Sequence, residues 1–371
     1  MKPGAIRIGV IGAGGFGLFA LQHLTQIPGV ELAAMAGTHR EAAFATAQRF
    51  GIPDIEDVDA LLARPEIDLI YIATPPFLHY PQALKALQAG KHVICEKPLA
   101  MNLQQADDMI GLAKKQNLVV IANLMQRYNP VFDLVRRLID SKLLGEFLHG
   151  YFENYASDEG LPAEHWFWDR SKSGGIFIEH GVHFFDLFSG WLGPGQVVAA
   201  QRTLRPESGF EEQVNCTVRY SSGALVNFYH GFTQPKRMDR QQFRLLFERG
   251  DVRLDEWVPV RARIHAVADE KTTRELTALF PGQLDVTQIY AGSDRAAFGR
   301  HKPLDMYQMI ELTYGVETEK MHRYGEMLRA MLRDQLCWIY DHRHARKLTH
   351  DNGRESLAMA LEATRLAEES K

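Results

Sequence analysis

Between Ile176 and Asp186 the chain carries two carboxylates and two imidazoles, and three of these groups have spacings suited to the transfer of a proton. If this stretch is a helix with about 100° per residue, Glu179, His183 and Asp186 lie within about 60° of one another. An imidazole flanked by carboxylates has a favoured tautomer and can accept a proton from an alcohol. The pattern predicts an acid/base site at His183. The alternative is the polar edge of a buried helix, with His183 satisfied inside the protein.

The same stretch could also bind a metal, because His180 and His183 together with Glu179 could supply ligands. However, the spacing is not H-E-x-x-H, no cysteine lies near, and His180 falls outside the polar stripe. We therefore expect no metal.

Glu96-Lys97-Pro98 is the second place where chemistry could occur. It follows the run Lys91 to Cys95, which predicts a buried strand. A lysine at the C-terminal end of a strand points into the ligand crevice, where it could bind a substrate hydroxyl or transfer a proton. The following proline restricts Lys97 to extended geometry. The alternative is an exposed lysine without a function.

A glycine turn near the N-terminus provides the element that such residues would surround. The stretch Ile6 to Gly17, IRIGVIGAGGFG, is an apolar run that ends in G-x-G-x-x-G, and an apolar helical segment follows it. Gly12 would permit the tight turn, Gly14 the approach of a pyrophosphate, and Gly17 the packing of helix on strand. The order of strand, turn and helix predicts a dinucleotide site, and a purely structural turn is the alternative.

The end of the second predicted strand, Val30 to Ala36, indicates which dinucleotide binds. An acidic residue here would hold the ribose 2′-hydroxyl of NAD. The chain instead has Gly37, Thr38 and Arg40, with no carboxylate before Glu41. Gly37 leaves room for a 2′-phosphate, Thr38 can donate a hydrogen bond and Arg40 can form a charged pair. We expect NADP in preference to NAD. The alternative is that Arg40 is only the solvated start of a helix.

The first third of the chain alternates predicted strands and helices, which indicates a parallel, doubly wound sheet. Ligands of such sheets bind beyond the C-terminal strand ends. The predicted strands after the first two are Asp68–Ala73, Lys91–Cys95 and Asn117–Ala122, and the predicted helices include Glu41–Phe50, Tyr80–Ala89 and Leu103–Lys115.

Beyond Asn123 this alternation stops, and several strand-like segments separated by turns predict a largely antiparallel sheet. Within it we expect one strand over Val252–Arg263 and a helix over Met306–Tyr314, while residues 281–303 fit no pattern. Two helices, Tyr324–Tyr340 and Gly353–Glu369, close the chain.

The composition excludes several classes of protein. The net charge is −4, which gives no attraction to nucleic acid or to an anionic membrane. The three cysteines are odd in number and far apart, which indicates a reducing compartment. The chain enters a strand almost at once and has no long apolar run, so we expect a cytoplasmic protein without a signal peptide or membrane span.

Together these motifs resemble the Gfo/Idh/MocA family, named for glucose–fructose oxidoreductase and inositol dehydrogenase. Three motifs carry the resemblance: the glycine turn, Glu96-Lys97-Pro98, and the G-G-x-x-x-D-x-G-x-H-x-x-D pattern at Gly174 to Asp186. It covers roughly residues 5–255, and the C-terminal helices more faintly. Glu179 stands where the family pattern usually has Asp, so the carboxylate is kept on a side chain one methylene longer.

The resemblance implies a Rossmann domain at residues 1–125 and an α+β domain with an open, largely antiparallel sheet at residues 126–371, with the last helices packing back on the first domain. It implies hydride transfer between nicotinamide and a carbinol or carbonyl carbon of a sugar, cyclitol or related polyol. It also implies a homodimer or homotetramer formed through the C-terminal sheet. The alternatives are an NAD-dependent glycoside hydrolase that retains its cofactor and a non-catalytic NADP-binding regulator.

The resemblance further implies roles for individual residues. Lys97 would bind the reacting oxygen beside the nicotinamide, His183 would be the acid/base, and Glu179 would orient the site. Trp166 and Trp168 could form an aromatic wall, although Trp168 also fits a plain core position. The expected cofactor contacts are Gly12, Gly14, Gly15, Phe16, Gly17, Gly37, Thr38, Arg40, Thr74, Pro75, His79, Glu96 and Lys97. The expected substrate contacts are Lys97, Arg127, Trp166, Trp168, Arg170, His180 and His183.

Overall fold

The computed structural model describes residues 4–12, 14–37, 40–55, 57–316 and 318–370. Its contacts divide the chain into two compact units, each assembled from segments that are distant in sequence. The first unit comprises Met1–Tyr128, Ala163–Asp186 and Tyr324–Arg365, and the second comprises Asn129–Pro162, Leu187–Arg323 and Leu366–Lys371. The glycine turn and the stretch from Gly174 to Asp186 therefore belong to the same unit.

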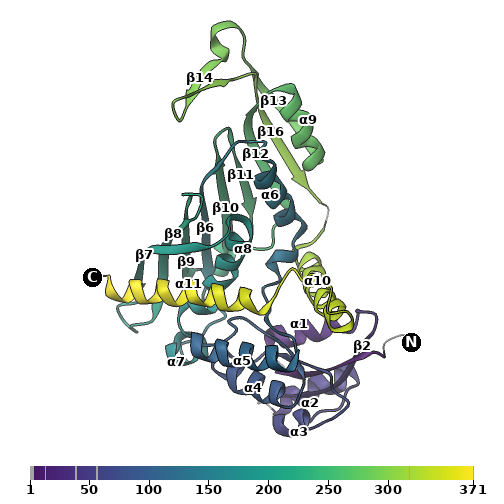
Figure 1. The fold of residues 1–371 in the computed structure, drawn as a ribbon. Coiled ribbons are helices and arrows are strands. Elements are labelled where there is room, and N and C mark those ends of the chain that lie inside the picture. Colours follow the sequence, from purple (N-terminus) through teal and green to yellow (C-terminus); the bar gives the residue numbers. More distant parts are fainter. Residues whose placement is uncertain (1–3, 13, 38–39, 56, 317, 371) are drawn as a thin grey trace. The chain divides into compact units, whose positions relative to one another are not determined.

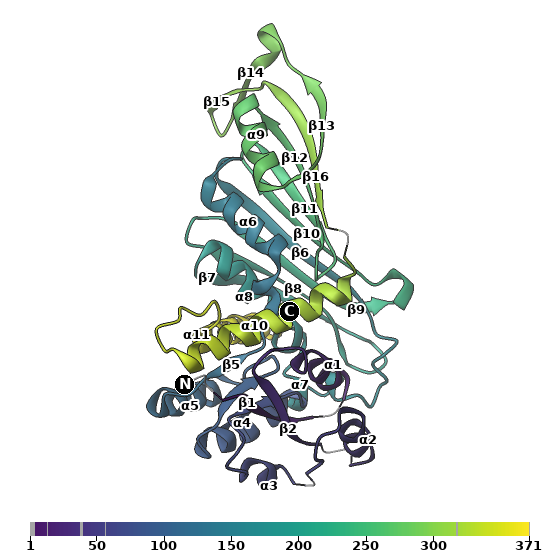
Figure 2. The same ribbon diagram turned by 90° about the vertical axis from the view of Figure 1, so that its right-hand side faces the viewer.

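The first unit contains a five-stranded parallel sheet in the order β2-β1-β3-β4-β5 (Figure 2). Its three inner strands are short apolar runs with nearly every side chain buried, as expected for a parallel sheet covered by helices. The predicted N-terminal sheet is confirmed. The strands are β1 (Ile6–Ile11), β2 (Val30–Ala36), β3 (Leu69–Ile72), β4 (His92–Cys95) and β5 (Val120–Ala122).

Local capping fixes the ends of the connecting helices. In α5, the side chain of Asn102 accepts a hydrogen bond from the Gln105 amide at 3.0 Å, and Asn117 ends the helix in the left-handed conformation. The early helices are α1 (Gly15–Leu24), α2 (Arg40–Phe50), α3 (Val58–Leu62), η1 (Pro76–Leu78), α4 (His79–Gln88), α5 (Leu103–Gln116) and η2 (Met125–Tyr128). The later ones are η3 (Trp166–Trp168), α7 (Arg170–Ser173), η4 (Phe177–Gly181), α8 (Val182–Leu192), α10 (Lys320–Tyr340) and α11 (His350–Glu369).

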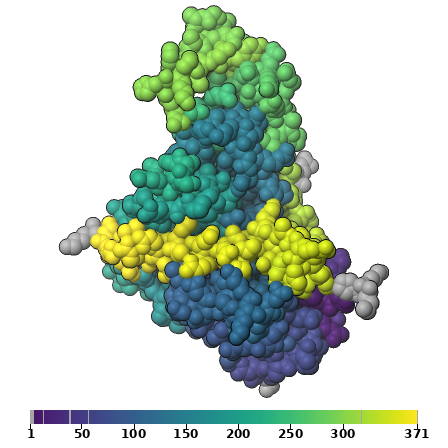
Figure 3. Space-filling view, viewed as in Figure 1, coloured from purple at the N-terminus to yellow at the C-terminus, as the bar shows by residue number. Residues whose placement is uncertain are grey.

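The first turns of α11 pack against the N-terminal part of the chain, where Figure 3 shows this helix lying along α5. Arg354 forms an ion pair with Asp107 of α5 at 2.5 Å. Gly353 allows close approach, because a Cβ here would lie 3.1 Å from Ala122 and 3.2 Å from Leu99. This docking puts C-terminal residues of the chain beside the end of β5.

The second unit contains a nine-stranded sheet in the order β13-β16-β12-β11-β10-β6-β9-β8-β7 (Figure 1). Every neighbouring pair is antiparallel except β6 and β9, so the predicted open, largely antiparallel sheet is confirmed. Its strands are β6 (Phe147–Ser157), β7 (Gly195–Leu204), β8 (Glu211–Tyr220), β9 (Leu225–Gln234), β10 (Arg240–Phe247), β11 (Gly250–Asp255), β12 (Arg261–Ala268), β13 (Gly282–Ile289) and β16 (Gln308–Gly315). Its helices include α6 (Pro130–Ser141), η5 (Lys236–Met238) and α9 (Glu270–Leu279).

Two expectations for this unit were wrong. The segment Met306–Tyr314, predicted as a helix, contains most of strand β16, in which Gln308, Ile310 and Leu312 are buried and alternate with half-buried or exposed residues. This period of two is that of a strand, and short apolar segments fit both periods in sequence. The predicted single strand Val252–Arg263 is split between β11 and β12, because Glu256 adopts a left-handed conformation with φ of 69°.

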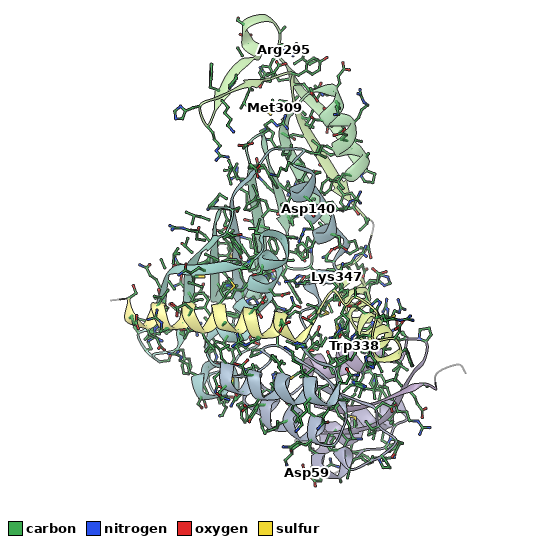
Figure 4. The ribbon with its side chains drawn as sticks, viewed as in Figure 1. Asp59, Asp140, Arg295, Met309, Trp338 and Lys347 are labelled. Atoms are coloured by element: carbon green, nitrogen blue, oxygen red, sulfur yellow. The ribbon has the colours of Figure 1, made fainter. Side chains whose placement is uncertain are left out.

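The residues that fitted no pattern, 281–303, form β13, the turn η6 (Gly292–Arg295) and most of a hairpin made of β14 (Ala296–Gly299) and β15 (Lys302–Asp305). Arg295, labelled in Figure 4, lies over the ring of Tyr307 at 5.3 Å and pairs with Asp305. Across the described residues, no helix combines the length and apolar character needed to cross a bilayer.

Candidate active site

The glycine turn has the shape that a dinucleotide phosphate requires. Gly12 has φ of 110°, and a Cβ at this position would overlap the carbonyl oxygen of Ala73. A Cβ on Gly17 would lie 2.5 Å from the carbonyl oxygen of Gly12, so both positions admit only glycine. At Gly14 and Gly15 a Cβ would meet open space, and no described side chain caps the N-terminus of α1. This open helix end fits a pyrophosphate group.

Phe16, another expected cofactor contact, lies in the first turn of α1 and is half-buried. Its ring packs against Phe19 at 5.3 Å and against Tyr324 of α10 at 5.8 Å between centroids.

At the end of β2 the structure reveals a carboxylate that the sequence pattern did not indicate. Arg40 donates to Asp54 at 2.5 and 3.3 Å and to the carbonyl of Ile55 at 3.3 Å. Asp54 follows α2 and reaches this place through a bridge to Met35 in β2. Gly37 is buried beside them, and Thr38 lies outside the described residues. In the sequence, Asp54 stands out only as an acidic residue in the loop after α2. No fixed spacing links it to the glycines of the turn.

The ends of β3 and β4 are joined by a buried histidine. The ring of His79 lies 2.7 Å from the carbonyl of Thr74 and 2.7 Å from the carbonyl of Pro98. Burial lowers the pKa of His79 to about 4. The Thr74 hydroxyl donates to Gln82 at 2.7 Å, and Pro75 is half-buried in an extended conformation. His79 thus connects the two loops, and its expected contact with the cofactor stays a prediction.

Glu96 is buried in a hydrogen-bonded cluster at the ends of three neighbouring strands. Its Oε1 accepts from the hydroxyl of Tyr71 at 2.5 Å and from Nδ2 of Asn123 at 2.8 Å. Tyr71 lies in β3 and Asn123 follows β5. Burial raises the pKa of Glu96 to about 7, and these hydrogen bonds oppose the rise. Neither partner was indicated by the sequence pattern.

Lys97 follows directly, and its peptide bond to Pro98 is cis. Its Nζ donates to the backbone carbonyl of Glu179 at 2.6 Å and also to the Glu179 carboxylate. The two side chains are 17% and 12% exposed, so both charges lie largely out of solvent. The structure therefore joins two motifs that are 82 residues apart in the chain.

The helix around His183 differs from the regular one that we predicted. Phe177–Gly181 is a single π-helical turn, and α8 begins only at Val182. A π turn has more residues per turn than an α-helix, so the predicted stripe of Glu179, His183 and Asp186 does not follow one line. Glu179 bonds Lys97, Asp186 pairs with Arg127, and His183 is 8% exposed in the first turn of α8.

Arg127, expected to contact substrate, forms a bidentate ion pair with Asp186. Its Nε lies 2.7 Å from Oδ2, and its Nη2 lies 2.8 Å from Oδ1 and 2.8 Å from the Asp186 carbonyl. Asn352 adds a longer contact to Oδ1 at 3.3 Å. Asp186 is 2% exposed, and burial raises its pKa while Arg127 lowers it. The pair fixes α8 one turn beyond His183.

The remaining expected substrate residues lie in the same unit. Trp168 is 7% exposed, and its ring meets that of Phe167 edge-on at 4.9 Å. Trp166, Arg170 and His180 are half-buried, and the ring of His180 packs on Phe184 at 5.5 Å. Among the described residues, no group of three or more His, Cys, Asp or Glu side chains could hold a metal ion.

The fold and these residues define a nicotinamide dinucleotide-binding protein with a half-buried lysine and a buried histidine beside the sheet. The model of an oxidoreductase family with an NAD-binding Rossmann fold matches residues 6–124, and that of the GFO/IDH/MocA C-terminal domain matches residues 132–253. A 1,5-anhydro-D-fructose reductase from Ensifer adhaerens is 30% identical over 240 residues, which are 61% of this chain and 69% of that protein. The chain belongs to the Gfo/Idh/MocA family.

Other comparisons agree with this assignment. An uncharacterised oxidoreductase from Synechocystis sp. is 32% identical over 150 residues, so this chain spans 40% of the length of that relative. The crystal structure of the WlbA dehydrogenase from Bordetella pertussis, in complex with NADH and UDP-GlcNAcA, superposes with a TM-score of 0.79. That superposition covers 100% of this chain and 98% of the other at 20% identity, which supports the fold.

Replacing Arg127 by Met should destabilise the protein, because the buried Asp186 carboxylate loses its partner. We expect the free energy of unfolding to fall by about 3–5 kcal/mol. Thermal and urea unfolding near neutral pH would measure this. The double variant Arg127→Met/Asp186→Asn removes both charges and should regain most of the loss. A single variant with unchanged stability and only a raised KM would instead identify Arg127 as a substrate ligand.

Proposed function

We propose that the protein is an NAD(P)-dependent oxidoreductase that transfers a hydride between nicotinamide and a carbinol or carbonyl carbon of a sugar, cyclitol or related polyol. The main support for this proposal is the hydrogen-bonded ion pair between Lys97 and Glu179 at the C-terminal end of β4. It lies in the same unit as the glycine turn and His183. Relatives named as a 1,5-anhydro-D-fructose reductase and a scyllo-inositol 2-dehydrogenase support the substrate class.

In this proposal Lys97 binds the reacting oxygen. An ammonium group has three N–H donors, and Glu179 accepts hydrogen bonds from Lys97 through two of its oxygens. The remaining donor is assigned to the substrate oxygen, whose developing negative charge it stabilises. Glu179 holds the ammonium in a fixed direction.

His183 transfers the hydroxyl proton. It takes the hydroxyl proton when the substrate is oxidised and returns it when the carbonyl is reduced. Its position on α8 is supported by the Arg127–Asp186 pair one turn further on. Nicotinamide supplies the hydride acceptor or donor in this chemistry. The direction in the cell is set by the cofactor and substrate present.

Trp166, Arg170 and His180 are assigned to the substrate site, because their side chains are only half-buried and lie near Glu179 in the sequence. An aromatic ring such as that of Trp166 suits the apolar face of a sugar. The burial of Trp168 against Phe167 supports the core position that was its alternative. The comparisons reported above name dehydrogenases and reductases, so the hydrolase and regulator alternatives gain no support.

Lys97→Met should lower kcat by about a hundredfold to a thousandfold, because the oxyanion loses its charged donor. His183→Asn should lower kcat by about a hundredfold to ten-thousandfold, because no base takes the hydroxyl proton. Nicotinamide absorbance would follow turnover across a panel of anhydroketoses, inositols and nucleotide-linked ketosugars. Lys115→Met, on an exposed position of α5, is the matched control. Full turnover in both active-site variants would reject the role assignments.

We further propose that Arg40 favours NADP over NAD and that Asp54 limits the preference. Gly37 leaves the space that an acidic residue would fill, which supports binding of a 2′-phosphate. In this structure, however, the guanidinium is already bonded to the Asp54 carboxylate. A 2′-phosphate must compete with that carboxylate for the same donors.

Asp54→Asn should raise the affinity for NADPH relative to NADH by about tenfold, because a charge-assisted bond to the competing carboxylate is lost. Arg40→Ala should abolish the preference. Fluorescence titration with both nucleotides measures the ratio. Asp59→Asn is the control, because Asp59 pairs with Lys85 on the surface of the same unit (Figure 4). An unchanged ratio in Asp54→Asn would show that Asp54 does not influence the choice of nucleotide.

We also propose a homodimer or homotetramer that associates through the sheet of the second unit. A hollow of about 330 Å³ lies on one face of this sheet, over β6, β8 and β9. It is lined in part by Tyr151, Tyr155 and Tyr229, and Arg240 lies over the Tyr155 ring at 4.6 Å. Tyrosine and arginine are enriched at protein interfaces, which supports this face. The cytoplasmic location remains a prediction from the sequence.

The variant Tyr155→Glu/Tyr229→Glu places two charges on this face and should convert the oligomer to monomers, because unpaired charges are costly in an interface core. Sedimentation velocity of the intact protein gives the molecular mass. Met321→Glu changes another exposed apolar side chain and serves as the control. A wild-type chain that sediments as a monomer would reject this proposal.

A further inference from the structure

The cluster around Glu96 contains a buried carboxyl with more acceptors than donors around it. Tyr71 is fully buried, Asn123 is 1% exposed and Glu96 is 8% exposed. The side-chain amide of Asn123 donates its N–H groups to Glu96 and to the Tyr71 oxygen, which lies at 3.1 Å. Its own Oδ1 is buried and accepts no hydrogen bond from a described residue. The cluster therefore has a place for one more proton.

Rotation of one amide would accommodate that proton. A half-turn of the Asn123 side chain brings Oδ1 to the place of Nδ2, where a protonated Glu96 can donate to it. In the arrangement seen here, the carboxyl receives the Tyr71 hydroxyl, the Asn123 amide and the backbone N–H of Lys97, all of which favour the ionised form. The same three strand ends can thus satisfy Glu96 in either state.

The groups that face Glu96 oppose and favour its ionisation to similar extents near neutral pH. Burial opposes ionisation most strongly, while Lys97 beside it and the donors from β3 and β5 favour ionisation. The pKa of Glu96 is accordingly raised to about 7. On the other sides, the Tyr324 hydroxyl from α10 and the Cys95 thiol feel the Glu96 charge, and burial keeps both neutral by raising their pKa values.

We propose that Glu96 exchanges a proton with solvent so that its charge balances the charge of the bound nicotinamide ring. This role rests on the function proposed above. Glu96 and Lys97 directly follow β4, at the strand ends where such sheets bind their ligands. Glu96 is ionised beside the oxidised, positively charged ring and holds a proton beside the reduced, neutral ring. It acts through its charge and is a positioning residue.

The proton balance of each step is defined. Binding of the oxidised cofactor releases the Glu96 proton to solvent, whereas binding of the reduced cofactor leaves it in place. When hydride leaves the substrate carbon for the ring, the hydroxyl proton leaves through His183 and Glu96 takes up one proton from solvent. The reverse reaction returns each proton.

The sign of the pH dependence follows from this balance. Above about pH 7 Glu96 is ionised, so the oxidised cofactor gains an opposite charge and binds more tightly; below it, this gain is lost. The reduced cofactor gains nothing from the charge. We expect the affinity of NADP⁺ relative to NADPH to rise by about threefold to tenfold from about pH 6 to about pH 8.5.

Isothermal titration of the intact protein with NADP⁺ and with NADPH, in buffers of different ionisation enthalpy, measures both affinities and proton release. Wild type should release part of a proton on binding NADP⁺ near pH 7 and none on binding NADPH. Glu96→Gln keeps an acceptor for Tyr71 and Asn123 but cannot ionise, so the ratio should become independent of pH. Glu211→Gln, which changes a carboxylate of equal exposure (8%) on β8, should behave as wild type.

Tyr71→Phe supplies a second test that does not remove the carboxyl. It deletes one donor to Oε1, so ionised Glu96 is less stable and the rise in relative NADP⁺ affinity should move to higher pH. The shift in Tyr71→Phe and the wild-type pH profile test the role of Glu96 even if Glu96→Gln does not fold. A flat wild-type ratio, or an unchanged profile in Glu96→Gln, rejects the inference. A protein that binds neither nicotinamide dinucleotide would instead reject the proposed function.

Discussion

The bond between Lys97 and Glu179 is the contact that the candidate site depends on. An ammonium that is 17% exposed needs a counter-charge, because an isolated charge is costly away from water. Glu179 provides a carboxylate and a backbone carbonyl from one residue, so it fixes the lysine from two directions. To make this bond, the chain must return at 163–186 to the sheet end at β4, and it brings His183 with it. One ion pair therefore assembles the catalytic residues that we propose.

The requirement that a buried charge have a partner also explains the contacts around Asp186 and Glu96. Asp186 is almost fully buried and has Arg127, and Glu96 is buried and has three donors. Each partner comes from a different strand end or helix, so satisfying the buried charge also fixes the geometry of the sheet edge. His79 has a comparable role, because its two ring nitrogens lie 2.7 Å from the carbonyl oxygens of two adjacent loops. Contacts among buried polar groups thus hold the loops and helices that carry Lys97 and His183.

The sequence predicts the parts of this site whose causes are local. The glycine turn is local, since Gly12 and Gly17 are required by backbone contacts within one strand, turn and helix and the neighbouring strand end. The parallel strands are predicted by short buried runs. The carboxylate of Asp54 and the cluster of Tyr71 with Asn123 come from strand pairing between distant segments, which no spacing rule encodes. The π turn was missed because a single inserted residue changes the helical phase without changing composition.

This geometry explains what the longer side chain of Glu179 does. The family pattern usually has Asp here, and the extra methylene lets the carboxylate turn back to the ammonium that its own backbone carbonyl already binds. A shorter side chain on the same turn would hold its carboxylate nearer the helix. With two of the lysine donors directed at Glu179, the direction of the third is determined by the tetrahedral ammonium. In the mechanism that we propose, the substrate oxygen approaches along that direction, so Glu179 would select where a hydroxyl can react.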